Sequence, residues 1–455
     1  MAEQEQAPRL FGTNGVRGVV NSKEMDAMFA LRLGMAIGTF MKGPVMIGTD
    51  ARTSNEMLKS ACVSGIMATG CDVQDCGIVP TPTLQYAVRT MKAAGGVVIT
   101  ASHNPPEFNG IKCIDADGTE MSRENEEAIE RIYHSGDFRR ADWEHIGRMR
   151  AYDSAIPRYI EAIMSKVDVL AIRKARLRVA VDCSNGAASL VTPRLLGRLG
   201  VRYVTMNADP NGSPAHNSEP TPENTKDIVV LVKSGGFDFG FVHDGDADRT
   251  VFIDGTGRYL LGDRSLALVA HYICKEHGGG LVVTNVASSM CVEDAVKIAG
   301  GSIIFTRVGS PTIARAMMDL GGIFGGEENG GLIFAQFQFC RDGAMAAAKM
   351  LEVVAKYGKL SALNDKIPSY SQYKTKTPCP DEKKEGVMAN LARNTKGERV
   401  DTTDGVKIFA KDGWVLVRPS GTEPIFRIFS ESKTPARARE LAEHYKDQVE
   451  RLTKA

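Results

Sequence analysis

Three aspartates at alternate positions, Asp244, Asp246 and Asp248, form the part of the sequence best suited to chemistry. They lie in the segment DGDADR and follow an apolar run, residues 239–243, that predicts a strand. Carboxylates at this spacing can converge on a hard cation, and a small site with positions left for water and phosphate favours magnesium. No glutamate follows at the offset that an EF-hand requires. An acidic turn is the alternative, although three like charges repel one another without a cation.

A second polar loop, TASHNP over residues 100–105, places Ser102 and His103 after another predicted strand. The serine could be a nucleophile or a phosphoryl carrier. A simple Ser/Asn turn is the alternative. A serine hydrolase fits poorly, because there is no G-x-S-x-G elbow and an adjacent serine and histidine do not make a triad.

The segment RPSGTEP over residues 418–424 has the composition of a phosphate cradle. Arg418 supplies a planar fork for an anion, Ser420 and Thr422 supply hydroxyls, and Gly421 lets backbone N–H groups approach. The segment is not a Walker A loop, and a surface turn is the alternative.

Two further glycine-rich segments carry weaker signals. GEENG over residues 326–330 could hold sugar hydroxyls through carboxylate and amide groups, with an acidic loop as the alternative. RLFGTNGVRG over residues 9–18 places Arg17 among glycines, with a structured turn as the alternative.

Three blocks of alternating strands and helices must position these loops. Each block predicts strand, helix, strand, helix, strand, over residues 44–100, 177–243 and 281–325. Each third strand leads into one of the polar loops, at 100–105, 244–249 and 326–330. Ligands of open α/β sheets bind beyond the carboxyl ends of strands, so these three loops could line one cleft.

The last part of the chain predicts a different fold. Strands are expected at 407–410, 414–418 and 426–430, followed by a charged helix over 434–451, which together indicate a smaller α+β domain. The expected domain boundaries are 1–153, 154–256, 257–368 and 369–455.

Composition narrows the class of protein. The 455 residues are 43% hydrophobic and 24% charged, which argues against wholesale disorder. With 56 basic and 55 acidic residues the chain lacks the basic footprint of a nucleic-acid binder. No apolar run reaches the roughly 18 residues of a membrane span. Nine cysteines without a C-x-x-C pair indicate reduced thiols. We therefore expect a cytoplasmic protein with no nucleic-acid or membrane partner, and leave its oligomeric state open.

In this order, the five motifs resemble those of the α-D-phosphohexomutase family, from Phe11 to Arg427. The resemblance implies three similar α/β domains with mixed sheets and a smaller C-terminal α+β domain, arranged around a central cleft. It implies that Ser102 carries a phosphoryl group. It also implies one magnesium ion per chain, held by Asp244, Asp246 and Asp248 with an oxygen of the phosphorylated Ser102.

The resemblance assigns the remaining roles. Lys112 is implied as general acid or base, with His103 as a weaker candidate. The implied substrate-binding residues are Arg17, Arg249, Glu327, Asn329, Arg418, Ser420, Gly421, Thr422 and Arg427. Two positions depart from the family pattern: Asn329 stands where many members have serine, and Gly331 where many have histidine. A catalytic histidine at position 331 is therefore not carried over.

The implied reaction moves a phosphoryl group between two hydroxyls of a hexose phosphate, through a hexose bisphosphate that serves as intermediate and activator. The opening FGTNGVRG is similar to that of phosphoglucosamine mutases, which favours glucosamine 6-phosphate and glucosamine 1-phosphate. Phosphomannomutase/phosphoglucomutase activity is the alternative. A non-catalytic sugar-phosphate sensor would be expected to lack Ser102 or one of the aspartates, and a metal-dependent phosphatase would release phosphate instead of isomerising the sugar.

Overall fold

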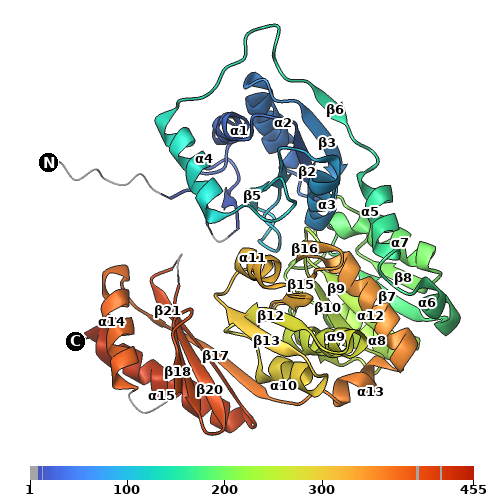
Figure 1. Cartoon of the computed structure of the whole chain (residues 1–455), viewed down its shortest axis with the longest axis vertical. Helices are drawn as coiled ribbons and strands as arrows, with labels where there is room; N and C mark the ends of the chain where they lie inside the picture. The colour runs from blue at the N-terminus through green and yellow to red at the C-terminus, as the bar shows by residue number, and fades with distance from the viewer. Residues whose placement is uncertain (1–8, 13, 396–398, 421–422, 455) are drawn as a thin grey trace. The chain divides into compact units, whose positions relative to one another are not determined.

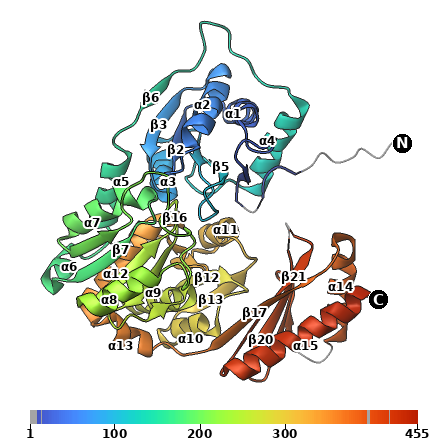
Figure 2. The ribbon, with the colours of Figure 1, turned by 180° about the vertical axis from the view of Figure 1, so that it is seen from behind.

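The computed structural model describes residues 9–12, 14–395, 399–420 and 423–454. The chain forms two compact units. The first contains Met1–Leu261 and Asn329–Leu363, and the second contains Gly262–Glu328 and Asn364–Ala455. Each unit is described by itself, and Figures 1 and 2 label the elements of both.

The first unit begins with a six-stranded mixed sheet in the order β1-β5-β4-β2-β3-β6. Side chains alternate across its strands, so that Val45 and Ile47 face one hydrophobic core while Met46 faces another. Helices α1, α2 and α4 contribute to the first core and α3 to the second (Figure 1). The bounds are β1 Val16–Val19, α1 Ala27–Met41, β2 Val45–Thr49, α2 Asn55–Ala68, β3 Val73–Ile78, α3 Thr81–Met91, β4 Gly95–Ile99, β5 Phe108–Ile114, α4 Arg123–Ser135 and β6 Met149–Ala151.

Helices α1 and α2 pack unusually closely because glycines lie at their contact. A Cβ atom on Gly34 would lie 2.2 Å from the carbonyl oxygen of Cys62, and one on Gly65 would lie 2.2 Å from that of Leu31. Neither position leaves room for a larger residue without moving a helix. The side chain of Asp26 caps the first turn of α1 by accepting from the N–H of Phe29 at 2.7 Å.

A second sheet of the first unit has the order β11-β10-β9-β7-β8. Its central strand β9 is buried along its whole length, and the rings of Phe239, Phe241 and Phe252 pack together on β9 and β10. Residues 332–363 of this unit add a β hairpin and helices. The bounds are α5 Ala155–Met164, α6 Val169–Ala175, β7 Arg178–Asp182, a 3₁₀ helix Ala187–Leu190, α7 Thr192–Leu199, β8 Arg202–Met206, α8 Lys226–Gly235, β9 Phe239–His243, β10 Thr250–Asp254, β11 Tyr259–Leu260, β15 Leu332–Phe334, β16 Gln338–Arg341, α12 Gly343–Tyr357 and α13 Leu360–Asp365.

The second unit combines parallel strands with an antiparallel sheet. Strand β12 pairs in parallel with β13 and β14, whereas the last sheet, in the order β17-β21-β20-β19-β18, is antiparallel throughout. Helix α15 packs along this last sheet (Figure 2). The bounds are α9 Gly262–His277, β12 Leu281–Asn285, α10 Met290–Ile298, β13 Ser302–Thr306, α11 Ser310–Leu320, β14 Phe324–Gly326, β17 Ser371–Pro378, α14 Asp381–Asn394, β18 Arg399–Asp401, β19 Val406–Ala410, β20 Gly413–Pro419, β21 Ile425–Ser432 and α15 Pro435–Lys454.

The α/β blocks with mixed sheets and the α+β tail confirm the predicted fold class. Within the described part of the chain, no helix is long and apolar enough to cross a membrane. The nine cysteines are free thiols.

A buried polar cluster joins the two halves of the second unit. The amide of Gln372 donates to Asp263 at 2.9 Å and to Glu431 at 3.2 Å, and Lys407 Nζ donates to the carbonyl oxygen of Val286 at 2.6 Å. Burial lowers the pKa of Lys407 to about 8. Burial, with the nearby carboxylates of Glu328 and Glu431, raises the pKa of Asp263 to about 7.

This raised pKa makes the stability of the second unit depend on pH. The folded pKa of Asp263 lies above its unfolded value, so its contribution is fully present below about pH 4 and is lost as the pH rises through about 7. Between pH 5 and 8 the loss is about 3 kcal/mol. We expect Asp263→Asn to flatten this part of the pH profile of thermal unfolding, measured by calorimetry. Parallel profiles for the wild type and the variant would contradict the assignment.

Candidate active site

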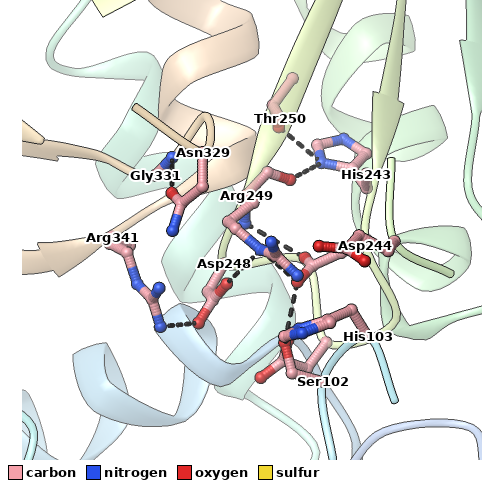
Figure 3. A network of polar contacts seen from close by, with 12 residues as sticks. Ser102, His103, His243, Asp244, Asp248, Arg249, Thr250, Asn329, Gly331 and Arg341 are labelled. Carbon is pink, nitrogen blue, oxygen red and sulfur yellow. Dashed lines mark hydrogen bonds and ion pairs between the residues drawn. The ribbon is translucent and has the colours of Figure 1, made fainter. Parts of the chain in front are cut away.

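Ser102 lies in a tight loop at the carboxyl end of β4, held by hydrogen bonds to its neighbours. Thr100 Oγ1 donates to Asp50 Oδ2 at 2.6 Å and accepts from the N–H of Ser102 at 2.8 Å. Ser102 has a φ of +54°, a left-handed conformation that is uncommon for residues other than glycine. In this conformation its Oγ donates to Asp244 Oδ2 at 2.9 Å (Figure 3). Backbone strain of this kind often marks functional loops.

The three aspartates follow β9 and are fully buried. Ala247, between two of them, also has a left-handed φ of +56°, which turns the loop back on itself. Carboxylate oxygens of Asp244, Asp246 and Asp248 lie within 4.8 Å of one another. The predicted convergence of the three carboxylates is therefore confirmed.

Each aspartate also has one oxygen held by a cationic side chain: Arg249 of the same loop, Lys112 of β5 and Arg341 of β16. The pairs are Asp244 Oδ2 with Arg249 Nε at 2.9 Å, Asp246 Oδ2 with Lys112 Nζ at 2.6 Å, and Asp248 Oδ2 with Arg341 Nη2 at 2.6 Å. Figure 3 shows the first and third of these pairs beside Ser102.

The other oxygens of this group fit a divalent cation. Asp246 Oδ1 and Asp248 Oδ1 are buried and make no hydrogen bond within the described residues. Burial raises the pKa of Asp248 to about 6, with Asp246 and Asp244 adding to the shift against the opposing effect of Arg341. A cation at these oxygens would offset both the missing hydrogen bonds and the repulsion between the carboxylates, and all-oxygen ligation suits magnesium.

His103 and Arg17 flank the serine. His103 Nδ1 lies 3.4 Å from Ser102 Oγ. Burial and the charges of Arg249 and Arg17 lower the pKa of His103 to about 2, so its imidazole is neutral near pH 7. Arg17, on β1, donates to Asn104 Oδ1 at 2.6 Å, and burial lowers its pKa. The N-terminal motif and the serine loop are therefore in direct contact.

Sequence reasoning missed Arg341, which lies at the end of β16. Besides its contact with Asp248, Nη2 lies 3.4 Å from Glu120 Oε1, and Glu120 in turn accepts from Asn14 of the N-terminal motif. Gly331 makes room for this arginine, because a Cβ atom at position 331 would lie 2.3 Å from Arg341 Cδ. The departure from histidine at position 331 thus coincides with an arginine in the same space (Figure 3).

The predicted sugar loop is divided between the two units. Asn329 belongs to the first, where its Oδ1 accepts from the N–H of Gly331 at 3.1 Å. Glu327 is buried in the second unit, where the neighbouring Glu328 accepts from Asn285 at 3.0 Å.

The predicted phosphate cradle lies in the second unit. Arg418 Nε donates to Asp404 Oδ2 at 2.7 Å, Ser420 Oγ accepts from the N–H of Glu423 at 3.2 Å, and Arg427 Nη2 donates to Glu423 Oε2 at 2.8 Å. Two further predicted cradle residues lie outside the described residues, namely Gly421 and Thr422.

Family models for the phosphoglucomutase/phosphomannomutase domains match almost the whole chain in order. The α/β/α domains I, II and III match residues 8–140, 157–257 and 261–370, and the C-terminal domain matches residues 375–448. A phosphoglucomutase/phosphomannomutase of Thermococcus kodakarensis is 51% identical over 96% of this chain and 97% of its own length. The chain belongs to the phosphoglucomutase/phosphomannomutase family of α-D-phosphohexomutases. It is an enzyme, a mutase of the isomerase class.

Other relatives of this phosphohexomutase carry a different name. Probable phosphoglucosamine mutases of Methanopyrus kandleri and Pyrococcus horikoshii are 42% and 41% identical, over 97% and 98% of this chain and 98% of each relative. Among solved structures, a phosphoglucomutase/phosphomannomutase family protein of Burkholderia thailandensis matches with a TM-score of 0.86 and 25% identity, over 97% of both chains. A putative phosphomannomutase of Thermus thermophilus matches with a TM-score of 0.83 and 28% identity, over 98% of this chain and 99% of the other.

Proposed function

We propose that this phosphohexomutase carries a phosphoryl group on Ser102 and interconverts glucosamine 6-phosphate and glucosamine 1-phosphate. The observation that carries the proposal is the contact between Ser102 Oγ and Asp244, beside two buried carboxylate oxygens that accept no hydrogen bond within the described residues. A serine that only stabilised its own turn would not need to face these carboxylates.

In the first half of the proposed reaction, the bond between phosphorus and Ser102 Oγ breaks and a bond from phosphorus to a sugar hydroxyl oxygen forms. The hydroxyl proton passes through a neighbouring base to Ser102 Oγ, which leaves a free serine and a hexose bisphosphate. The second half reverses these changes with the other phosphate of the sugar. A hexose bisphosphate would accordingly also activate enzyme that has lost its phosphoryl group.

Two side chains are placed to handle the proton. Lys112 Nζ is buried against Asp246, and the neutral imidazole of His103 lies beside Ser102 Oγ. We assign the role of general acid or base to Lys112, and keep His103 as the weaker candidate.

Magnesium, held by Asp244, Asp246, Asp248 and an oxygen of phosphorylated Ser102, would neutralise charge on the phosphoryl group. The protein supplies further positive charge around the same place through Arg249 and Arg341.

We propose that Arg17 and Arg249 bind the substrate. Recognition of the sugar is assigned to Glu327 and Asn329, and recognition of its second phosphate to Arg418, Ser420, Gly421, Thr422 and Arg427. Domain limits near residues 153, 256 and 368 would place these groups on four domains.

The choice of glucosamine is supported by the opening motif and by the names of relatives near 40% identity. A carboxylate such as Glu327 within about 4 Å of a protonated 2-amino group would contribute on the order of 1 kcal/mol. The relative at 51% identity favours the second candidate, a phosphoglucomutase/phosphomannomutase with the same mechanism.

A substrate panel decides between the two candidates. We expect kcat/KM for glucosamine 1-phosphate to exceed that for glucose 1-phosphate and mannose 1-phosphate several-fold, with a trace of the matching bisphosphate present. The advantage should shrink as the pH rises through the pKa of the sugar amine, and Glu327→Gln should shrink it without a pH change. A tenfold preference for glucose or mannose 1-phosphate would establish the second candidate and leave the role of Ser102 untouched. Release of inorganic phosphate without isomerisation would contradict both.

A further inference from the structure

Arg52 follows β2. Every N–H of its guanidinium group donates a hydrogen bond, either to the segment around Ser102 or to Asp50, which also accepts from Thr100. Nε donates to Asp50 Oδ2 at 3.1 Å. The four remaining donors bind backbone carbonyl oxygens of the serine loop: Ser102 at 3.0 Å, Asn104 at 2.6 Å, Pro105 at 2.7 Å and Phe108 at 2.8 Å. A guanidinium has five donors in a fixed plane, so this side chain is fully committed.

Three of these carbonyl groups belong to the stretch between strands β4 and β5, and the fourth is that of Phe108, the first residue of β5. The stretch holds Ser102 in its left-handed conformation, and Phe108 begins the strand that carries Lys112. Most of this segment forms no hydrogen-bond ladder with another strand. Arg52 therefore supplies the hydrogen bonds that the backbone of a regular strand would obtain from a neighbouring strand. The side chain of Arg52 is only 9% exposed.

The carbonyl oxygen of Ser102 also determines how closely the aspartate loop can approach. A Cβ atom on Gly245 would lie 2.5 Å from that oxygen, so the two loops touch at this point. Fixing the carbonyl oxygen of Ser102 therefore fixes the serine against the loop that carries Asp244 and Asp246.

We infer that Arg52 is a positioning residue for the phosphoryl carrier, which acts through the backbone of residues 102–108 and touches no substrate. The inference rests on the proposed role of Ser102. Its motivation is geometric: one planar cation sets both the backbone conformation of Ser102 and the start of the strand bearing Lys112. Misplacing a reacting group by about 1 Å can cost roughly 100-fold in rate.

Arg52→Lys tests this inference, because an ammonium keeps the charge but cannot reach four carbonyl groups in one plane. We expect kcat to fall between about 10-fold and 100-fold, with KM for the hexose phosphate within about twofold of wild type. The single-turnover rate at which a hexose bisphosphate phosphorylates Ser102, followed by intact mass, should fall by the same factor. In Arg52→Ala, added guanidinium ion should restore part of this rate, since the deleted side chain would leave room beside the pocket that Asp50, Arg52 and Asn104 line.

Arg139→Lys is the control for the loss of an arginine–carbonyl contact elsewhere in the unit. Arg139 also binds a backbone carbonyl of the same unit, that of Thr69 at 2.6 Å, but lies away from the site. We expect its substitution to lower the thermal midpoint without changing the single-turnover rate. Should Arg52→Lys fail to fold, Asp50→Asn is the second test. Asparagine keeps the shape of the side chain that binds Arg52 Nε, and the substitution should lower the same rate.

The outcomes separate this inference from the proposed function. If wild-type Ser102 takes no phosphoryl group from the bisphosphate, the proposed function fails. If it does, and folded Arg52→Lys or Asp50→Asn is phosphorylated at the wild-type rate, only the inference about Arg52 is overturned.

Discussion

Ser102→Ala is expected to fold like the wild type and to lose at least about 100-fold in mutase rate. The alanine removes the oxygen that we propose carries the phosphoryl group, and no other hydroxyl donates to Asp244 among the described contacts. The fold should survive, because the loop is held by Thr100 and Arg52 through backbone groups that alanine retains. The rate is measured with glucosamine, glucose and mannose phosphates in parallel.

Two further measurements make this test specific. Intact mass should show a fraction of wild-type enzyme one phosphate heavier, with the phosphoryl group mapped to Ser102 and absent from the variant. Ser189→Ala is the control, because Ser189 Oγ is buried in the same unit and makes no hydrogen bond within the described part of the chain, so its loss should change neither the activity nor the phosphorylated fraction. Near-wild-type turnover by Ser102→Ala would end the carrier hypothesis.

The sequence predicted the central part of the site because its residues are close together in the chain. Asp244, Asp246 and Asp248 share one loop, and a strand before them directs that loop to one sheet edge. The serine loop likewise follows its own strand. We could expect the two loops to meet, because ligands of open α/β sheets bind beyond the carboxyl ends of strands.

Residues that support the site from elsewhere left no local signal. Arg341 reaches Asp248 from the end of β16, and Arg52 reaches Ser102 from the end of β2, the strand next to β4. An arginine after a strand can lie on a solvated surface as well as in a buried network. The sequence alone therefore does not show that Arg341 and Arg52 belong to the site. Gly331 did signal a departure from the family pattern, but the arginine that fills its space could not be inferred from the glycine.

The fold was predicted best where strands are apolar. Strands β2, β4 and β9 are buried on both faces, and their apolar runs were recognised. Strand β5 was missed because Asn109, Gly110 and Lys112 interrupt its pattern, although all three are buried. Helix α14 was also missed in a tail expected to be mainly strands, because most of its described side chains face solvent. Val387 and Leu391 are buried in the core, and Met388 and Ala392 pack against it.

Removal of divalent cations is expected to abolish activity, and magnesium should restore it. The physical reason is the pair of buried oxygens on Asp246 and Asp248 that accept no hydrogen bond in the described part of the chain, next to a serine that would carry two negative charges when phosphorylated. Calcium should bind but support little turnover, since its longer and looser coordination would misplace the phosphoryl oxygens. The measurements are activity in excess chelator, before and after each cation is added, and calorimetric titration of the metal-free protein with magnesium.

Asp246→Asn should lower magnesium affinity at least about 10-fold, the low end for changes around a metal site, while the protein remains folded. An asparagine oxygen can still accept the hydrogen bonds of Lys112 and Thr81, so the loss should reflect the ligand charge more than the packing. Asp254→Asn is the matched control: Asp254 is equally buried on the neighbouring strand, but it binds Arg258 at 2.9 Å outside the site. Its substitution should lower stability and leave magnesium affinity unchanged. Full activity in excess chelator, or equal losses of affinity in the two variants, would show that the three aspartates hold no catalytic metal and serve only to balance Lys112, Arg249 and Arg341.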